Sequence, residues 1–409
     1  RALPTEETKA KLTQAADLGL GVRVAMARDL AAPPWVDAVH HATITRLILE
    51  QGVIPASYQP YIPTNSAGYH PGFHTLAAVF TWLSGLEIQQ AMLILGQALN
   101  ALAAPAVYLL ALQISGSRAA AVLAALGCAV FTPMPAYLTS WGRYTQLTGL
   151  LILPAAHKFI SLAFADLAQR PALRWLLLAA IACAGMFLVH YRVLAFFALL
   201  LLAELAVLAA RAVVMPELRR TLANQVAGLC AAALVAVMLS LPWWPDTVRT
   251  LFAPRLANPT PAAAAFSDFS WSYLTSASGT AVMIAAGLGL LVALAKQRWF
   301  ATSLLLWLSL LVFSANLGVF GLPGASFINN TSVEIMLFMP FCTLAGYAVW
   351  EFYQWIEKLL PQRVKKTAQA VFVLLAAAAS FAGAARLAPI LNPITILARQ
   401  NDLAAIRWI

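Results

Sequence analysis

The chain has 409 residues, of which 61% are hydrophobic and 10% are charged, and its mean hydropathy is +0.78. Because about a quarter of the residues of a soluble domain are charged, this composition excludes a soluble globular protein and indicates that lipid surrounds most of the surface. A net charge of +10 would suggest nucleic acid as a partner of a soluble protein. Here we expect no nucleic-acid partner, because the basic residues follow the pattern of membrane topology.

Residues 1–87 precede the first long apolar run, and we expect an outward-facing region of loops and short interfacial helices. Residues 1–35 are polar enough to form a loop and contain no visible membrane span. The chain begins without a methionine, so we expect a first helix upstream of it. A helix should begin at the Pro-Pro pair 33–34, since proline is accepted in a first turn. Residues 73–86 are too few to span a bilayer and should lie in its interface.

Apolar stretches of about 18 to 25 residues recur from residue 88 onward, which is the length at which a helix crosses a bilayer. They must be helices, because lipid cannot satisfy the backbone of an open strand, and the alternation of a barrel strand is absent. We therefore predict an all-α, polytopic transmembrane helix bundle over residues 88–387, and a tail, residues 388–409, that begins a soluble domain. Its ten spans, or eleven with an upstream helix, are 88–114, 118–138, 144–167, 172–189, 193–212, 221–241, 277–296, 299–319, 333–356 and 367–387.

Basic residues mark every second connection between these spans. They are Arg118, Arg170, Arg174, Arg211, Arg219, Arg220, Lys296, Arg298, Lys358, Arg363, Lys365 and Lys366. By the positive-inside rule these connections face the cytoplasm, so the N-terminal region, the tail and the other connections face outward. We expect a multi-pass protein of the plasma (inner) membrane whose active site lies on the periplasmic or extracellular side.

Polar chemistry concentrates in the outward segment 29–74. It holds four of the six histidines, namely His40, His41, His70 and His74, together with Asp29 and Asp37. Asp37 and His41 are four residues apart, so they would share one face of a helix. An Asp after Pro-Pro-Trp can also be a helix cap, and the residues alone leave both interpretations open.

Three features of this segment occur together. Asp37 stands near a helix start, a Gly-x-x-Pro turn follows about fifteen residues later at 52–55, and Tyr-His-Pro-Gly at 69–72 precedes the next span. This combination resembles the GT-C superfamily of integral-membrane glycosyltransferases, in particular the protein O-mannosyltransferase and aminoarabinose transferase type. The resemblance covers about residues 29–165. The chain departs from the family in two places, because Ala38 replaces the acid of an Asp-Glu pair and glycine replaces a second proline after His-Pro.

The resemblance implies transfer of a sugar from a polyprenyl-phosphate donor to an acceptor at the outer face of the membrane, with inversion. The family's loop aspartate takes the proton of the acceptor hydroxyl, and this role falls on Asp37. The leaving lipid phosphate needs cationic or hydrogen-bonding groups near the outer leaflet. Arg143, Arg192 and His190 are the candidates, although a snorkelling anchor explains Arg143 equally well.

The remaining pocket candidates are polar or aromatic groups in the outward segments, and they are His40, His41, Tyr69, His70, His74, Tyr144 and Glu334. Glu334 stands at the start of a span, where a carboxylate needs a polar cavity. A divalent metal ion such as zinc is the one cofactor left open, with Asp37, His41, His70 and His74 as ligands, but no metal-binding signature accompanies them. In mid-span, His157 and Lys158 are expected either to line an internal polar groove or to pair with Glu204, and the residues alone leave both open.

Three functions from different classes follow. The first is a membrane glycosyltransferase that uses a lipid-linked sugar donor. The second is a non-catalytic GT-C-like membrane subunit that serves as an assembly scaffold in a larger complex, an alternative that the missing Asp-Glu pair favours. A transporter is third, because no internal repeat is visible and the polar residues gather at one face rather than at the midplane.

Overall fold

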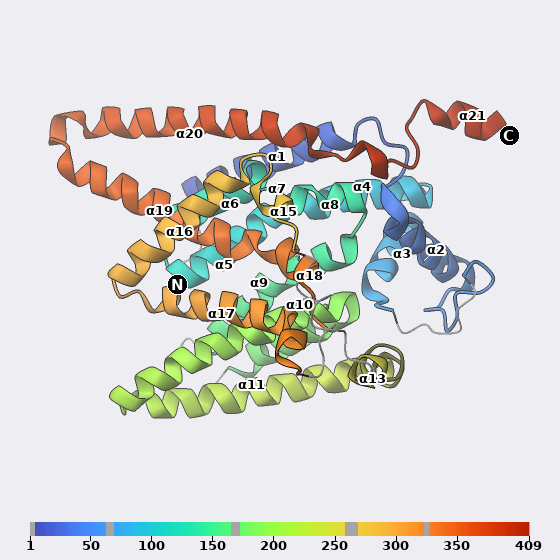
Figure 1. Cartoon of the computed structure of the whole chain (residues 1–409), viewed down its shortest axis with the longest axis horizontal. Helices are drawn as coiled ribbons and strands as arrows, with labels where there is room; N and C mark the ends of the chain where they lie inside the picture. Colours follow the sequence, from blue (N-terminus) through green and yellow to red (C-terminus); the bar gives the residue numbers. More distant parts are fainter. Residues whose placement is uncertain (1–4, 63–68, 165–171, 258–268, 323–326, 409) are drawn as a thin grey trace.

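The computed structural model describes residues 5–62, 69–164, 172–257, 269–322 and 327–408, and every named element within them is helical (Figure 1). The all-α prediction is therefore confirmed. The longer helices are α1 (Glu6–Ala27), α2 (Trp35–Gln51), α3 (Gly72–Ser84), α4 (Ile88–Ala101), α5 (Ala103–Ser115), α6 (Arg118–Val130), α9 (Tyr144–Ala163), α10 (Leu173–Val214), α11 (Leu218–Ser240), α16 (Gly279–Ala295), α17 (Trp299–Ala315), α19 (Phe338–Leu359) and α20 (Lys365–Leu387).

Short helices connect these elements, mostly at the outward end. They are α7 (Pro133–Ala136), α8 (Leu138–Trp141), η1 (Leu241–Trp243), α12 (Trp244–Thr247), η2 (Val248–Phe252), α13 (Ala253–Ala257), α15 (Ser272–Thr275), η3 (Leu317–Phe320), α18 (Asn330–Met336), η4 (Gln362–Val364), η5 (Ala388–Ile390), η6 (Pro393–Thr395) and α21 (Asp402–Trp408).

Six helical stretches among the described residues are long and apolar enough to cross a membrane, and three shorter apolar helices accompany them. Each of the ten predicted spans overlaps one of these stretches. The 42-residue helix α10 contains two of the predicted spans, and its helical geometry is interrupted at His190, where φ is −168° and ψ is 101°. The break lies at the predicted connection 190–192 and separates two spans. The protein is a polytopic membrane protein, as predicted.

The N-terminal segment differs from its prediction as a loop. Residues Glu6–Ala27 form α1, which packs against α4 and α6. Its buried side comprises small or apolar residues at helical spacing, and Gly19 allows contact with Ala129 of α6. Arg23 is buried in this interface, where its Nε donates to Asn100 Oδ1 at 3.1 Å and its Nη1 donates to the carbonyl of Ala129. The polar composition was misleading because the other charged residues of α1 lie on its exposed side, while Arg23 is satisfied by hydrogen bonds inside the bundle.

The basic connections lie at the end of the bundle opposite α2 and α3. Figure 1 shows the α10–α11, α16–α17 and α19–α20 turns at the left end, and α2, α3 and α13 at the right. Arg170 lies outside the described residues. The arrangement places the histidine-rich segment at the end away from the basic turns, as the charge pattern predicts.

The C-terminal tail folds back onto the outward end. Leu30 and Arg399 form an isolated antiparallel bridge, and the backbone N–H of Gln400 donates to the carbonyl of Asp29 at 3.0 Å. The backbone N–H of Asn392 donates to Ser140 Oγ at 3.0 Å. The tail thus contacts both the segment before α2 and helix α8. Its role as the start of a soluble domain stays a prediction.

Candidate active site

An ion pair joins two segments that are far apart in sequence, at the end of the bundle that carries α2 and α3. Arg143 Nε donates to Asp37 Oδ2 at 2.7 Å, and the two side chains are 37% and 32% exposed. Helix α2 begins at Trp35 with Pro34 as its N-cap, so Asp37 lies inside the first turn and is not the cap residue. Its carboxylate is therefore directed to a tertiary partner, at a helix end that favours negative charge.

A glycine allows this ion pair to form. Gly142 has φ of +58°, and a Cβ at this position would lie 2.8 Å from Ala38 Cβ and 2.9 Å from the carbonyl oxygen of Pro34. The turn between α8 and α9 therefore rests directly on the first turn of α2. Ala38 is 3% exposed under this turn. The position at which the resembled family has a second acid therefore lies against the turn that carries Arg143.

Trp141 completes the setting of Arg143. The Arg143 guanidinium carbon lies 4.7 Å from the centroid of the Trp141 ring, and Trp141 is itself packed edge-to-face against Tyr137 and Tyr273. Such a stack orients the planar guanidinium while leaving its donors at the edge of the ring. Arg143 is thus fixed by an aromatic ring and a carboxylate, an arrangement that differs from the mobile snorkelling anchor considered from the sequence.

Two buried histidines are hydrogen-bonded to each other. His74 Nδ1 donates to the carbonyl of His70 at 2.8 Å, since a carbonyl oxygen only accepts. The neutral His74 ring then accepts at Nε2 from His41 Nδ1, which is 2.9 Å away. Burial lowers the pKa of His41 to about 3 and the pKa of His74 well below its usual value, and the neighbouring His40 and His70 add to the effect on His41. Both rings are therefore uncharged at neutral pH and act as a rigid support.

His70 bridges this support to the break in α10. Its ring centroid lies 5.0 Å from that of His190 and 5.2 Å from that of Tyr191. His190 is buried, and its Nδ1 has no hydrogen-bond partner among the residues that the structure describes. Such an atom is an unusual feature in a folded protein, and it identifies His190 as a group that a ligand can satisfy.

Gly72 explains the second departure from the family motif. A Cβ at Gly72 would lie 2.7 Å from Val189 Cγ2 and 3.0 Å from the carbonyl oxygen of Leu188. Helix α3 therefore begins in direct contact with the break of α10. The glycine in place of a second proline permits the approach of the segment that carries His70 to the segment that carries His190.

Arg192 lies on the other side of the same break. Its Nε donates to the carbonyl of Phe327 at 2.8 Å, and its guanidinium carbon lies 5.5 Å from the Tyr191 ring centroid. The phenol of Tyr69 responds both to this arginine and to the ion pair. Burial raises the pKa of the Tyr69 phenol, and the negative charge of Asp37 raises it further. A hydrogen bond with Thr145 and the positive charges of Arg143 and Arg192 lower it. The charges of Asp37 and of the two arginines thus act on the same phenol in opposite directions.

Three of the predicted pocket residues lie elsewhere. His40 is exposed on α2 and does not join the histidine cluster. Tyr144 is completely buried, its ring occupies the space above Gly96, and Gln97 Nε2 donates to its hydroxyl at 3.3 Å. Glu334 is also completely buried, and its Oε1 accepts from the backbone N–H of Ser270. Tyr144 and Glu334 therefore stabilise the surroundings of the site from within the core.

The four residues considered as metal ligands do not form a metal site. Within the described ranges, no group of three or more His, Cys, Asp or Glu is arranged to hold a metal ion. Both ring nitrogens of His74 are engaged, one with His41 and one with the His70 carbonyl. Asp37 is paired with Arg143. The donor set of Asp37, His41, His70 and His74 therefore does not fit a divalent cation.

Residues outside the predicted set of site residues contribute to the site. Gln146 Nε2 donates to the carbonyl of Ser332 at 2.8 Å and ties the start of α9 to α18. Gly142, Ala38 and Trp141 position the ion pair, as described above. The Trp-Gly-Arg sequence at 141–143 was the available signal, because a glycine between an aromatic residue and an arginine favours a tight turn that presents both side chains.

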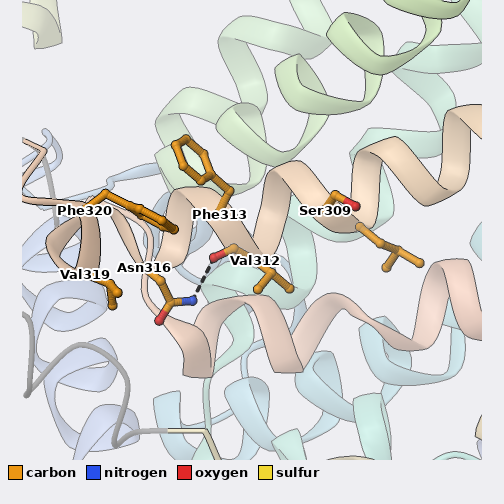
Figure 2. Close-up of a pocket in the computed structure, with 7 residues that line it drawn as sticks. Ser309, Val312, Phe313, Asn316, Val319 and Phe320 are labelled. Carbon is orange, nitrogen blue, oxygen red and sulfur yellow. Dashed lines mark hydrogen bonds between the residues drawn. The ribbon is translucent and has the colours of Figure 1, made fainter.

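An apolar pocket lies at the outward end of α17. Figure 2 shows Ser309, Val312, Phe313, Asn316, Val319 and Phe320 around it, and its volume is ≈ 530 Å³. Asn316 forms the polar end, where its Nδ2 donates to the Val312 carbonyl and also to Asn330 Oδ1 at 3.0 Å. Asn330 is the first residue of α18 and stands three residues after Phe327, whose carbonyl accepts the hydrogen bond from Arg192. The polar end of the pocket is therefore linked along the chain to the hydrogen-bond partner of Arg192.

Comparison with protein families gives one match over residues 15–404, described as "Family of unknown function (DUF6541)". The chain belongs to this family. No curated protein matches the chain. The family assignment therefore brings no established activity, and the fold is the remaining source of comparison.

Solved structures with a similar fold are GT-C glycosyltransferases, so the resemblance seen in the sequence is confirmed for the fold. The Archaeoglobus fulgidus oligosaccharyltransferase in the apo form gives a TM-score of 0.59 at 15% identity, covering 98% of this DUF6541 chain and 57% of its own. ArnT from Cupriavidus metallidurans bound to undecaprenyl phosphate gives a TM-score of 0.56 at 15% identity, covering 93% of this chain and 74% of its own. The oligosaccharyltransferase has also been solved in complex with Zn and sulfate, with a TM-score of 0.58 and 14% identity over 97% of this chain and 55% of its own. The chain thus spans little more than half the length of the oligosaccharyltransferase.

Proposed function

We propose that the chain is a membrane glycosyltransferase that moves a sugar from a polyprenyl-phosphate donor to an acceptor at the outer face of a plasma membrane. The observation that carries the proposal is the Asp37–Arg143 ion pair, since it places a carboxylate beside a cation at the end of the bundle away from the basic turns. The fold shared with ArnT, which has been solved with undecaprenyl phosphate bound, supports the choice of donor.

The donor phosphate is assigned to the break in α10. Arg192 supplies a fixed positive charge there, and His190 supplies the buried Nδ1 that has no partner within the described ranges. Arg143 adds a second guanidinium from the facing turn. Arginine suits this task because its planar donors match phosphate oxygens. The polyprenyl chain is assigned to the apolar pocket of Figure 2, whose Asn316 is hydrogen-bonded to Asn330, three residues after the Phe327 carbonyl that Arg192 contacts.

The chemical step assigned to Asp37 is general base catalysis. The acceptor hydroxyl gives its proton to the Asp37 carboxylate as its oxygen forms the bond to the anomeric carbon. The bond from that carbon to the phosphate oxygen breaks, and its electron pair leaves with the lipid phosphate, so the configuration inverts. Arg143 and Arg192 stabilise the negative charge that develops on the departing phosphate.

The histidines serve the site as neutral supports in this proposal. His41 and His74 hold Tyr69 and His70 between the ion pair and the break in α10. Because burial keeps the pKa of His41 at about 3, this pair brings no charge that would compete with the arginines for the phosphate. Their rigidity fixes the distance between Asp37 and the arginines, which positions the base relative to the donor.

Undecaprenyl phosphate binding and sugar transfer together test the proposal. Purified variants are assayed for binding of undecaprenyl phosphate, and for transfer in membranes supplied with radiolabelled lipid-linked sugars. Asp37→Asn should abolish transfer but leave binding equal or tighter, because it removes a carboxylate that competes for Arg143. Arg192→Gln should weaken binding by about tenfold, the loss expected for one charge-assisted contact.

Two results contradict parts of the proposal. Full transfer by Asp37→Asn would exclude Asp37 as the base. If the wild-type protein neither binds undecaprenyl phosphate nor transfers sugar, the chain instead acts as a non-catalytic subunit of a larger membrane complex, the alternative that the missing Asp-Glu pair suggests. Arg220→Gln, on the α10–α11 turn at the opposite end of the bundle, is the control for a general effect of lost charge.

A further inference from the structure

A second lateral groove lies on the bundle between α6, α16, α19 and α20, away from the proposed active site. Its volume is ≈ 540 Å³. Its lining combines small residues, such as Gly127, Ala345, Gly346 and Ala376, with large apolar ones, such as Phe352 and Phe372. An apolar lining of this kind suits an extended hydrocarbon chain.

The length of the groove matches an acyl chain. Its α19 residues run from Cys342 to Leu360, which corresponds to about 27 Å of helix at 1.5 Å per residue. One leaflet of hydrocarbon is about 15 Å deep, half of the bilayer core. The groove therefore extends along the whole depth of the leaflet on the side of the α19–α20 turn and continues past the midplane.

A protein helix does not fit between α19 and α20. The ring centroids of Tyr353 and Phe372 are 4.6 Å apart across the groove, whereas a helix with its side chains is about 10 Å wide. An acyl chain placed in the groove has to lie beside this contact. In the span that contains α20, 17% of the most apolar window is buried, compared with 83% for the span that contains α19, so lipid covers much of α20.

Positive charge lies near the end of the groove at the α19–α20 turn, whereas the one charged residue among the lining residues is the carboxylate Glu357. The four basic residues of this turn are Lys358, Arg363, Lys365 and Lys366. Lys365 precedes the lining residue Ala368 by three positions and continues the stripe of Ala368, Phe372, Leu375 and Ala379 that α20 directs into the groove. Figure 1 shows this turn at the left end, opposite α2 and α3.

We propose that this groove is a binding site for one anionic phospholipid of the cytoplasmic leaflet. An acyl chain lies between α19 and α20, and the phosphate headgroup is held by Lys365 with Arg363 and Lys366 at the turn. Basic residues next to a membrane helix attract anionic lipids, and the apolar groove adds the specificity that an exposed basic cluster lacks. The bound lipid fastens α20 to the bundle.

Phosphatidylglycerol is the probe, with phosphatidylcholine as the neutral comparison. The full chain is purified in detergent, and lipid retention is measured by native mass spectrometry together with the rise in Tm on lipid addition. Lys365→Gln should weaken phosphatidylglycerol retention about fivefold, as expected for one lysine at an anionic headgroup. Ala376→Phe, which fills the groove, should weaken retention of both lipids. If Lys365→Gln does not assemble, Arg363→Gln gives the same comparison.

Two matched variants serve as controls. Ala378→Phe adds the same ring to an exposed position of α20 outside the groove, and Arg220→Gln removes one charge from another basic turn of the same membrane face. Both should retain phosphatidylglycerol like the wild-type protein. The proposal is overturned if Ala376→Phe retains as much lipid as Ala378→Phe, if phosphatidylcholine binds as well as phosphatidylglycerol, or if a second copy of the chain covers the groove.

Discussion

Gly142 lies against Ala38, so closely that a Cβ on Gly142 would be 2.8 Å from the Ala38 Cβ. This contact brings the α8–α9 turn onto the first turn of α2 and sets Arg143 beside Asp37. The ion pair therefore depends on a backbone contact between two small residues, each adjacent to one member of the pair. The relationship leads to the first prediction.

Gly142→Ala should separate Asp37 from Arg143 and abolish sugar transfer, because the added methyl group occupies the position of Ala38. The left-handed backbone at Gly142 adds a cost of about 1 to 2 kcal/mol for any non-glycine residue. Gly85→Ala is the control, since Gly85 has φ of +67° with nothing within 4 Å of the added Cβ. Transfer activity and Tm are measured for both variants, and equal activity of the two would contradict the role of the contact.

Gly72→Ala should lower Tm, although alanine is favoured over glycine inside a helix by about 1 kcal/mol. The reason is that its Cβ would lie 2.7 Å from Val189 Cγ2 at the break of α10. Gly21→Ala in α1 is the matched variant, because a Cβ there meets nothing within 4 Å and should raise Tm. Thermal unfolding in detergent compares the two, and a stabilised Gly72→Ala would show that α3 and α10 are not in tight contact.

The stability of the protein should fall as the pH is lowered through the range between about 6.5 and 3. An unfolded histidine binds its proton near pH 6.5, whereas the folded pKa of His41 is about 3 and the folded pKa of His74 is also well below the usual value. Between these values the unfolded state binds more protons than the folded state. Each histidine therefore lowers the free energy of unfolding by about 1.4 kcal/mol for every unit by which the pH falls. Above pH 6.5 this contribution is fully present.

The measurement is the Tm as a function of pH between about 7.5 and 4.5. This range extends from about one unit above to about two units below the pKa of an unfolded histidine. His41→Gln should flatten this pH dependence relative to the wild-type protein. His40→Gln serves as the control, because His40 is exposed on the same helix. A slope in His41→Gln as steep as in the wild-type protein would mean that the buried pair does not govern acid stability.

The His157–Glu204 pair should keep its contribution to stability in Glu204→Gln and lose it in Glu204→Ala. His157 Nδ1 donates to Gln113 Oε1 at 2.8 Å, and His157 Nε2 lies 2.9 Å from Glu204 Oε1. Glu204→Ala leaves Nε2 without its partner and should destabilise the bundle by about 1 kcal/mol or more. Glu204→Gln keeps a hydrogen-bonding group at this place and should have a Tm close to the wild-type value. Equal Tm values for the two variants would contradict the structural role of the pair.

Several features of the fold could be predicted because they depend on local composition. Apolar run length predicted the membrane spans, the basic turns predicted the end of the bundle opposite the histidine-rich segment, and the polar residues at 190–192 marked the break in α10. Pairing of His157 with Glu204 was one of the two roles predicted for His157, because two ionisable groups within apolar spans have few alternatives to pairing. The start of α2 followed from the Pro-Pro pair before Trp35.

The sequence by itself determined that the chain is an all-α membrane protein with its histidines and Asp37 at the end of the bundle away from the basic turns, since hydropathy and charge act over short distances along the chain. Only the tertiary structure decided that α1 is a packed helix, that Tyr144 and Glu334 are buried, and that Arg143 pairs with Asp37 across 106 positions. The ion pair depends on the close approach at Gly142, and the burial of Tyr144 depends on the packing of its ring over Gly96. Such contacts are properties of two segments at once, so no single stretch of sequence contains them.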